Sequence, residues 1–295
     1  MKVRIGIGAG RAATSSKELG ALADDLVELG FDSIWLSEVL TGEGLDPLVG
    51  LAFVAAHNST LKLGTTMLLP GRNPVRLAKS LASLDVLSDG RLLITFVPGL
   101  VDPPERDAIG LEPSRRAAAI EDGLPLVREL LSGEPVSYDG PLGSFSEVLV
   151  TPETVQQPLE FWLGGMVTSS LVRCGQLGDG WLPSLCTPEE ALAGKKVIDE
   201  AAADAGREIS PEHFGVSVGY APDGLDDRAL ANLRRRRRGR DTAGLVPVGQ
   251  AALRATIEGF VDVGFSKFVV RPITLARGWR GELEGIAEAV GDLQS

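Results

Sequence analysis

The chain has few of the residues that most often perform catalysis unaided. Its 295 residues include two histidines, His57 and His213, and two cysteines, Cys174 and Cys186. The cysteines lack metal-site spacing, and we expect two buried thiols rather than a disulfide. Neither histidine directly follows a strand-like run, and no serine, histidine and aspartate set or pair of carboxylates stands out. The sequence therefore gives little support to hydrolysis by protein side chains and predicts no metal site.

Long apolar runs and net positive charge are also missing. No uninterrupted apolar stretch reaches the roughly 20 residues that a membrane helix needs, and the start, MKVRIGIGAG, lacks a secretory signal pattern. The formal net charge of -11 argues against general affinity for nucleic acid or anionic lipid. One basic run, RRRRR at 234–238, favours a solvated helix end over a phosphate-binding cluster. We expect a cytoplasmic protein with neither nucleic-acid nor membrane partners.

What the sequence does contain is a series of short apolar runs separated by segments of helical period. The runs are residues 3–8, 33–37, 61–68, 92–97, 159–164, 180–183, 214–220 and 267–271. Their lack of clean alternation is typical of strands buried on both faces, as in a parallel sheet covered by helices. Such a repeat predicts one α/β domain over residues 1–295, a (β/α)8 or TIM barrel. An open doubly wound sheet is the alternative, but Arg11 occupies the last glycine position of a GxGxxG pattern.

Two segments are longer than the connections of a minimal barrel. Residues 133–155 carry turn residues and strand-like pieces, and residues 224–248 contain the arginine run. We predict that both are insertions near the mouth of the barrel.

In a barrel of this kind the active site forms at the carboxyl ends of the strands. The residues at these positions are poor in acids and bases, and Glu38 is the one carboxylate among them. Chemistry at such a site belongs to a cofactor. The candidates for the substrate pocket are Arg11, Val39, Leu100, Trp181 and Arg271.

The stretch FWLGGMVTSS, residues 161–170, has the features of an anion-binding turn. Gly164 and Gly165 let the backbone approach a ligand, because neither has a side chain. The helix that begins at Val167 or Thr168 offers unpaired N–H groups and the positive end of its dipole. A phosphate on an organic cofactor fits this turn, and a plain strand-to-helix turn with a hydroxyl cap is an equal alternative.

Four longer stretches, taken together in this order, are informative about the family of the chain. They are ADDLVELGFDSIWLSE (23–38), DPLVGLAFVAAHNSTLKLGTTMLLPGRNPVRLAKSLASLDVLSDGRLLI (46–94), FWLGGMVTSSLVRCGQLGDGWLPS (161–184) and VPVGQAALRATIEGFVDVGFSKFVV (246–270). The second is the most specific, because it combines an LGT strand, a helix opened by NP, LDVLSDGR and another strand. With these stretches the chain resembles the luciferase-like monooxygenase superfamily, and within it the coenzyme F420-dependent oxidoreductases of actinobacteria. The resemblance covers nearly the whole chain.

The resemblance implies a (β/α)8 barrel that holds coenzyme F420, or alternatively FMN, with its ring over the strand ends. It also implies roles for single residues. Glu38 matches an acidic residue beside the ring and is the catalytic candidate. The other positions that match cofactor-binding ones are Thr66 and Met67 at a non-proline cis peptide behind the ring, Gly99 at a backbone approach to the ring, and Gly164, Gly165, Val167 and Thr168 at the cofactor phosphate.

Two positions depart from the family pattern. Val39 stands where many members have a histidine, and Leu100 stands where the sugar-phosphate dehydrogenases of the family have a glutamate. Both proton-handling positions are therefore apolar, which argues against that dehydrogenase reaction.

Three functions stay open at this point. The first is an F420-dependent oxidoreductase that moves a hydride between the deazaflavin and a small, rather apolar organic substrate. The second is an FMN-dependent monooxygenase that receives reduced flavin from a separate reductase. The third is a barrel that binds a flavin-like ligand without catalysis. Family members commonly pair through barrel helices, so we expect a homodimer.

Overall fold

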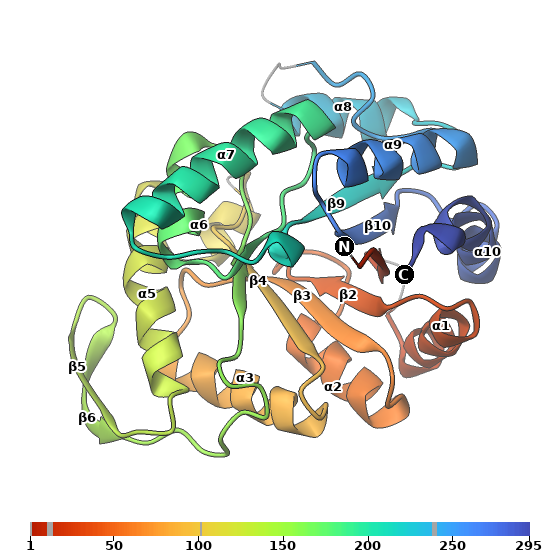
Figure 1. Cartoon of the computed structure of the whole chain (residues 1–295). Helices are drawn as coiled ribbons and strands as arrows, with labels where there is room; N and C mark the ends of the chain where they lie inside the picture. Colours follow the sequence, from red (N-terminus) through yellow and green to blue (C-terminus); the bar gives the residue numbers. More distant parts are fainter. Residues whose placement is uncertain (1, 11–13, 101, 238–240) are drawn as a thin grey trace.

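The fold is a barrel of parallel strands, seen in a computed structural model that describes residues 2–10, 14–100, 102–237 and 241–295 (Figure 1). The strand order is β8-β7-β4-β3-β2-β1-β10-β9, and isolated bridges between β8 and β9 bring the two edges together into a nearly closed ring. The predicted (β/α)8 barrel is thus confirmed. The barrel strands are β1 (Arg4–Gly8), β2 (Ser33–Ser37), β3 (Lys62–Leu68), β4 (Leu92–Val97), β7 (Phe161–Leu163), β8 (Gly180–Trp181), β9 (Gly215–Tyr220) and β10 (Lys267–Pro272).

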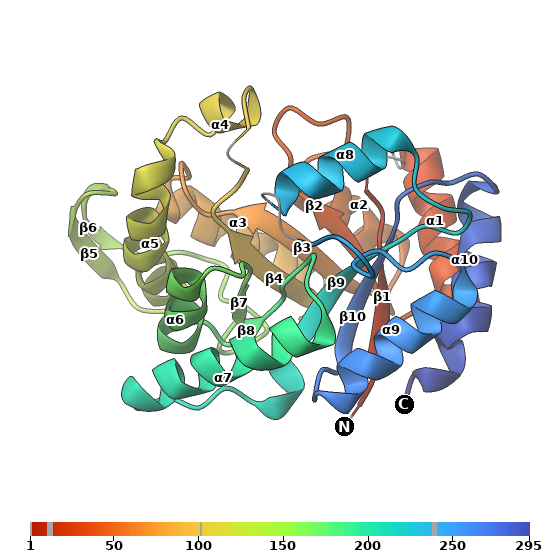
Figure 2. The ribbon, with the colours of Figure 1, turned by 90° about the horizontal axis from the view of Figure 1, so that it is seen from above.

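Helices surround the barrel on the outside (Figures 1 and 2). Several begin at a polar capping residue followed by proline: the side chains of Asp46 and Asn73 accept backbone N–H groups, and Thr187 forms a capping box with Glu190. The helices are α1 (Ser16–Glu28), α2 (Pro47–His57), α3 (Pro74–Leu87), α4 (Glu105–Ala108), α5 (Arg116–Leu130), α6 (Thr168–Leu177), α7 (Pro188–Asp204), α8 (Asp227–Arg236), α9 (Gln250–Asp262) and α10 (Gly278–Val290). Among the described residues, no helix combines the length and the apolar character needed to cross a membrane.

Side chains alternate between the helices and the barrel interior along each strand. Ile5 and Ile7 of β1 belong to the large core between strands and helices, whereas a Cβ on Gly6 would meet Ser33 and Trp35 inside the ring. A second buried cluster fills the interior itself, with Trp35, Leu182 and Val269 at its centre. The interior is therefore packed by a few large side chains next to glycine.

The barrel mouth, where the strands finish, carries α4 and α8, while both chain ends lie at the opposite face (Figure 2). The predicted insertion 224–248 contains α8. The insertion 133–155 forms a hairpin of β5 (Val136–Gly140) and β6 (Gly143–Val148), which lies beside α5 on the outside of the barrel (Figures 1 and 2). Its predicted place near the mouth is wrong, because the hairpin leaves the carboxyl end of α5 and packs Leu142 against Gly123 of that helix.

Candidate active site

Glu38 lies directly after β2, and its carboxylate is already engaged. Its Oε1 lies 2.5 Å from Arg72 Nη2, and its Oε2 accepts the backbone N–H of Leu68 at 2.7 Å. The Glu38 side chain is 4% exposed. The sequence gave no sign of this partner, Arg72, which precedes the Asn73 cap of α3. The ion pair fixes the carboxyl end of β3 to the carboxyl end of β2.

Thr66 and Met67 lie on a regular strand, so the predicted cis peptide is wrong. The cis peptides found in the described part of the chain precede Pro104, Pro152 and Pro158. Residues 62–68 pair in parallel with β2 on one side and β4 on the other, without a break in register. Alternation then turns the fully buried Met67 side chain outward into the helix-facing core, away from the barrel interior.

Gly99 follows β4 with a φ of 85°, a conformation that favours glycine. A Cβ there would lie 2.6 Å from Ile109 Cδ1 and 2.7 Å from Leu68 Cδ2. Gly99 therefore lets the segment after β4 pack closely against the end of β3. Whether its backbone also approaches a ring stays a prediction.

Two buried charged residues that sequence reasoning missed organise this segment. Arg116 of α5 donates to the carbonyl oxygens of Leu111, Pro98, Leu100 and Arg106 at 2.6 to 3.4 Å. The apolar periodicity of the sequence does not identify Arg116 as buried, because it is a charged residue at the start of a helix.

Glu105 of α4 joins the same segment to the loop after β2. Its carboxylate accepts the N–H groups of Leu40 and Thr41 and the hydroxyl of Thr41, each at 2.9 Å. The loops that follow β2 and β4 are consequently tied together across the mouth.

The Gly164–Gly165 turn lies at the carboxyl end of β7, next to β4. Gly164 donates its N–H to the Phe96 carbonyl at 3.0 Å, and a Cβ on Gly164 would lie 2.8 Å from Val97 Cγ1. Gly165 has a φ of 118°, and a Cβ there would lie 2.9 Å from Ser170 Cβ. Both glycines are needed for the turn itself.

The first turn of α6 is open toward solvent. Val167 is the N-cap residue and supplies no side-chain cap, and Val167, Thr168 and Ser169 are all exposed. The N–H groups of Thr168 and Ser169 make no hydrogen bond to any part of the chain that the structure describes. The alternative of a hydroxyl-capped turn is wrong, because no side chain caps this helix. The turn thus offers free N–H donors at the positive end of a helix, which is a suitable cradle for a phosphate.

The predicted substrate-pocket residues do not all come together. Trp181 is completely buried in the helix-facing core, and its Nε1 donates to the Gly165 carbonyl at 3.0 Å, so its assignment to the pocket is wrong. It supports the glycine turn from behind. Val39 and Leu100 are 41% and 39% exposed on the loops after β2 and β4. Arg11 lies outside the described residues.

Arg271 is the pocket candidate whose side chain enters the barrel. It lies near the end of β10, on the same face of the strand as Val269 of the interior cluster. Its Nε donates to Ser217 Oγ of β9 at 2.7 Å. Arg271 therefore reaches the mouth from the side of β9, β10 and β1, whereas Glu38 and Gly164 lie on β2 and β7.

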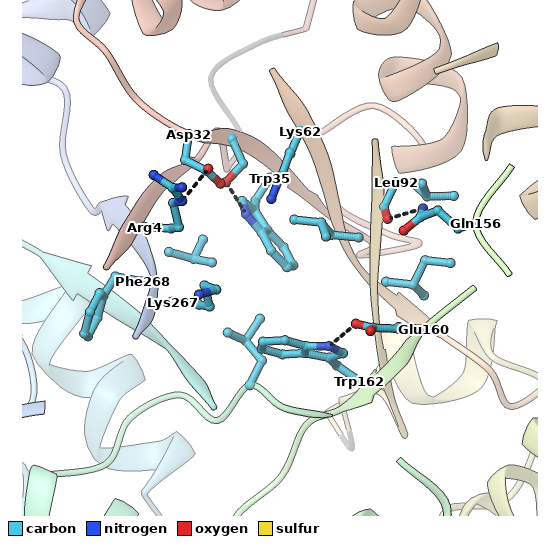
Figure 3. Close-up of a pocket in the computed structure, with 15 residues that line it drawn as sticks. Arg4, Asp32, Trp35, Lys62, Leu92, Gln156, Glu160, Trp162, Lys267 and Phe268 are labelled. Atoms are coloured by element: carbon cyan, nitrogen blue, oxygen red, sulfur yellow. Dashed lines mark hydrogen bonds and ion pairs between the residues drawn. The ribbon is translucent and has the colours of Figure 1, made fainter. Parts of the chain in front are cut away.

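A different cavity opens at the amino ends of the strands (Figure 3). The indole rings of Trp35 and Trp162 project into it, and Arg4 and Asp32 form an ion pair of 3.5 Å at its rim. Trp35 Nε1 donates to Ser33 Oγ at 3.0 Å. Catalytic groups in this fold gather at the carboxyl ends, so this cavity is separate from the candidate site.

The histidines are engaged away from the mouth groups, and the cysteines are buried. His57 pairs with Asp24 on the outer helices at 2.9 Å, and His213 contacts the Asp179 carbonyl at 2.9 Å. Cys174 and Cys186 are buried free thiols, as predicted.

A sequence profile of the luciferase-like monooxygenase family matches residues 2–260, and the chain belongs to this family. Among curated proteins, an uncharacterized protein of Mycobacterium tuberculosis is 31% identical over 185 residues, 61% of this chain and 64% of that protein. A 5,10-methylenetetrahydromethanopterin reductase of Methanolobus tindarius is 27% identical over 68% of this chain and 59% of its own length. An F420-dependent glucose-6-phosphate dehydrogenase of Kineococcus radiotolerans is 28% identical over 59% and 54%. The chain thus spans 54 to 64% of the length of these relatives.

Solved structures with the same fold cover almost the whole chain. A monooxygenase of Streptomyces bottropensis superposes with a TM-score of 0.80 at 24% identity, covering 98% of this chain and 99% of that one. An F420-dependent secondary alcohol dehydrogenase in complex with an F420-acetone adduct gives 0.84 at 15% identity, covering all of both chains. A Baeyer-Villiger monooxygenase of Pseudomonas putida in complex with FMN gives 0.79 at 16%, covering 100% and 99%. At these identities the likeness shows the fold.

Proposed function

We propose that this protein is an F420-dependent oxidoreductase that transfers a hydride between the deazaflavin ring and a small organic substrate in the barrel mouth. Membership of the luciferase-like family supports a redox function. A relative and a structural neighbour whose names include F420 support the deazaflavin. We propose the same cofactor for this protein because its own residues suit a deazaflavin with a phosphate.

The observation that carries the proposal is the open first turn of α6. Gly164 and Gly165 bring backbone to the ligand position without side chains, and the N–H groups of Thr168 and Ser169 have no acceptor among the described residues. A phosphate there gains charge-assisted hydrogen bonds and the helix dipole together. The residues present therefore fit a phosphate-bearing cofactor.

When bound, the deazaflavin supplies the atom that accepts or donates a hydride. The residues of the chain then bind, orient and exclude water around it. Glu38 is committed to Arg72 and the Leu68 N–H, so we assign it first to holding the end of β3. Its participation in proton transfer stays a prediction.

The experiment is a titration of the purified protein with F420, FMN and riboflavin. The proposal expects F420 to bind more tightly than FMN, and FMN more tightly than riboflavin, which has the flavin ring without the phosphate. Equal affinity for FMN and riboflavin would show that the α6 turn does not bind the phosphate. A protein that binds none of the three is not an oxidoreductase of this kind.

An FMN-dependent monooxygenase is the second candidate. Structural neighbours that are monooxygenases, one of them in complex with FMN, support it, and the α6 turn suits either phosphate. Tighter binding of FMN than of F420, with oxygen consumption on addition of chemically reduced FMN, is the result that selects this function.

A further inference from the structure

The guanidinium of Arg271 is held in place inside the barrel. Its Nε donates to Ser217 Oγ of β9 at 2.7 Å. On the other side lies β1, where a Cβ on Gly8 would be 2.6 Å from both Cγ and Nη1 of Arg271. A glycine at this position of β1 therefore leaves room for the arginine side chain to fold across the mouth.

The outer nitrogens of this guanidinium have no partner. Neither Nη1 nor Nη2 of Arg271 donates a hydrogen bond to any described residue, and no described aspartate or glutamate lies within 4.0 Å. A partly buried cation without a counter-ion is costly, and proteins normally pair it. The chain has a net charge of -11, so the lack of a carboxylate beside Arg271 is not due to a general shortage of acidic residues.

Three acids on the segments around the mouth have partners other than Arg271. Glu38 holds Arg72, Glu105 holds the loop after β2, and Asp102 lies 3.7 Å from Arg235. None of these contacts involves Arg271.

A second positive charge is added by α8, which lies over the mouth (Figure 2). Desolvation first, and then the charge of Arg236, lower the pKa of the Arg271 guanidinium to about 10. Arg271 is still protonated at neutral pH, and the two arginines repel one another. An anion bound to Arg271 offsets the desolvation of its guanidinium.

The predicted solvated helix end at 234–238 is only partly correct for residues 234–237, and Arg238 lies outside the described residues. Arg234, Arg235 and Arg236 are exposed, but Arg237 is anchored to Glu190 at 2.8 Å and to the Leu185 carbonyl at 3.1 Å. This anchor fixes the end of α8 to the start of α7. The position of α8 over the mouth is thereby fixed (Figure 2).

We propose that Arg271, oriented by Ser217, binds an anionic group of the substrate, a carboxylate or a phosphate. A guanidinium with two free outer nitrogens is suited to both oxygens of such a group. The site lies across the mouth from the α6 turn, so the reacting part of the substrate comes between the two anion sites. That the occupant is the substrate rests on the proposed function, whereas the affinity for an anion does not.

The first test uses acetate on the protein without cofactor. Thermal melting is followed at constant ionic strength while sodium chloride is replaced by sodium acetate, and acetamide serves as the neutral analogue. At ten times its dissociation constant, acetate raises the melting temperature of the parent by about 3 °C, and acetamide does not. Arg271→Gln abolishes this rise, and Ser217→Ala weakens acetate binding roughly threefold to tenfold.

Arg234→Gln is the matched control, because it removes the same charge from an exposed position of α8. It leaves the acetate effect unchanged. An equal acetate effect in parent and Arg271→Gln overturns the proposal, as does an equal effect of acetate and acetamide on the parent. Should Arg271→Gln not fold, the comparison of acetate with acetamide and the Ser217→Ala variant decide by themselves.

A second arm identifies the source of the anion. F420 and FMN are titrated into the parent and Arg271→Gln. If Arg271 binds the substrate, the cofactor affinity of Arg271→Gln stays within about twofold of the parent's. A loss of cofactor affinity of tenfold or more, about 1.4 kcal/mol, would mean that an acidic group of the cofactor binds Arg271, and it would overturn the substrate assignment. Failure of the parent to bind either cofactor refutes the proposed function and leaves the acetate result standing.

Discussion

Glu38 and Arg72 form an ion pair that joins the ends of two neighbouring barrel strands. Arg72 Nη2 lies 2.5 Å from one carboxylate oxygen of Glu38, and the other oxygen accepts the Leu68 N–H. Glu38, the catalytic candidate from the sequence, therefore also stabilises the ends of β2 and β3. The two roles make different predictions.

Glu38→Gln and Arg72→Gln break the same ion pair from opposite sides. Each should lower the free energy of unfolding by about 1 to 3 kcal/mol, because a partly buried charge loses its partner. If Glu38 also exchanges a proton near the ring, Glu38→Gln lowers turnover by roughly 100-fold or more, and Arg72→Gln lowers it much less. Denaturant titration and kcat with a substrate found by screening measure the two effects. Equal losses of turnover would mean that Glu38 only holds the strand ends.

Thr168→Glu should separate cofactor binding from folding. A carboxylate in the first turn of α6 interacts favourably with the helix dipole, so stability rises by about 0.3 to 1 kcal/mol. The same charge repels a phosphate at the free N–H groups and should weaken binding of F420 or FMN roughly tenfold. Thr168→Gln, similar in shape and neutral, is the control for melting and titration. Identical affinities of the two variants would argue against a phosphate at this turn.

Gly165 is a poorer position for that test. Its φ of 118° and the 2.9 Å approach to Ser170 Cβ mean that valine strains the turn as well as obstructing it. We expect Gly165→Val to lower the melting temperature together with cofactor affinity. A variant with parental melting and weak binding would show that the turn adapts.

Arg116→Met should destabilise the protein severely. It leaves four carbonyl oxygens of the segment after β4 without their donor, at a cost of about 3 to 5 kcal/mol in the free energy of unfolding. Arg115→Met is the matched control, because the side chain of Arg115, next to Arg116 in the sequence, is exposed. This variant should change the free energy of unfolding by no more than about 0.5 kcal/mol. Urea titration of both variants checks the difference. A mild effect of Arg116→Met would mean that water replaces the guanidinium.

The buried cysteines predict a loss of stability at high pH. Burial raises the pKa of the Cys174 and Cys186 thiols from 9.0 to about 12. Between these pH values the unfolded chain releases the thiol protons and the folded chain keeps them, so the free energy of unfolding falls as pH rises. The slope is about 1.4 kcal/mol per pH unit for each thiol.

Comparison of the parent with Cys174→Ala/Cys186→Ala between pH 9 and 10.5 isolates this contribution. The double variant should lose less stability over that interval, because other groups that titrate there are common to both proteins. Parallel curves would show that the thiols ionise without unfolding.

Much of the fold was predictable, because it depends on local pattern. Seven of the eight predicted apolar runs contain a whole barrel strand, and the eighth lacks only the last residue of β10, since strands covered by helices on one side and packed against the barrel interior on the other are largely apolar. The α6 turn was also found from sequence, because two glycines followed by a helix start are neighbours along the chain. The hairpin of 133–155 was placed wrongly, since its length says nothing about the side of the barrel on which it packs.

The sequence by itself determined the barrel, the family and the location of the glycine turn before α6, because strand burial, helix capping and glycine turns are set by residues close together in the chain. Only the tertiary structure decided which charges meet. Glu38 faces Arg72, Arg116 faces the backbone after β4, and Arg271 faces no acid in the part of the chain that the structure describes, although all three look alike as isolated charges in the sequence. Ion pairs between different strand ends depend on which strands the sheet places side by side and on where the side chains after each strand then point.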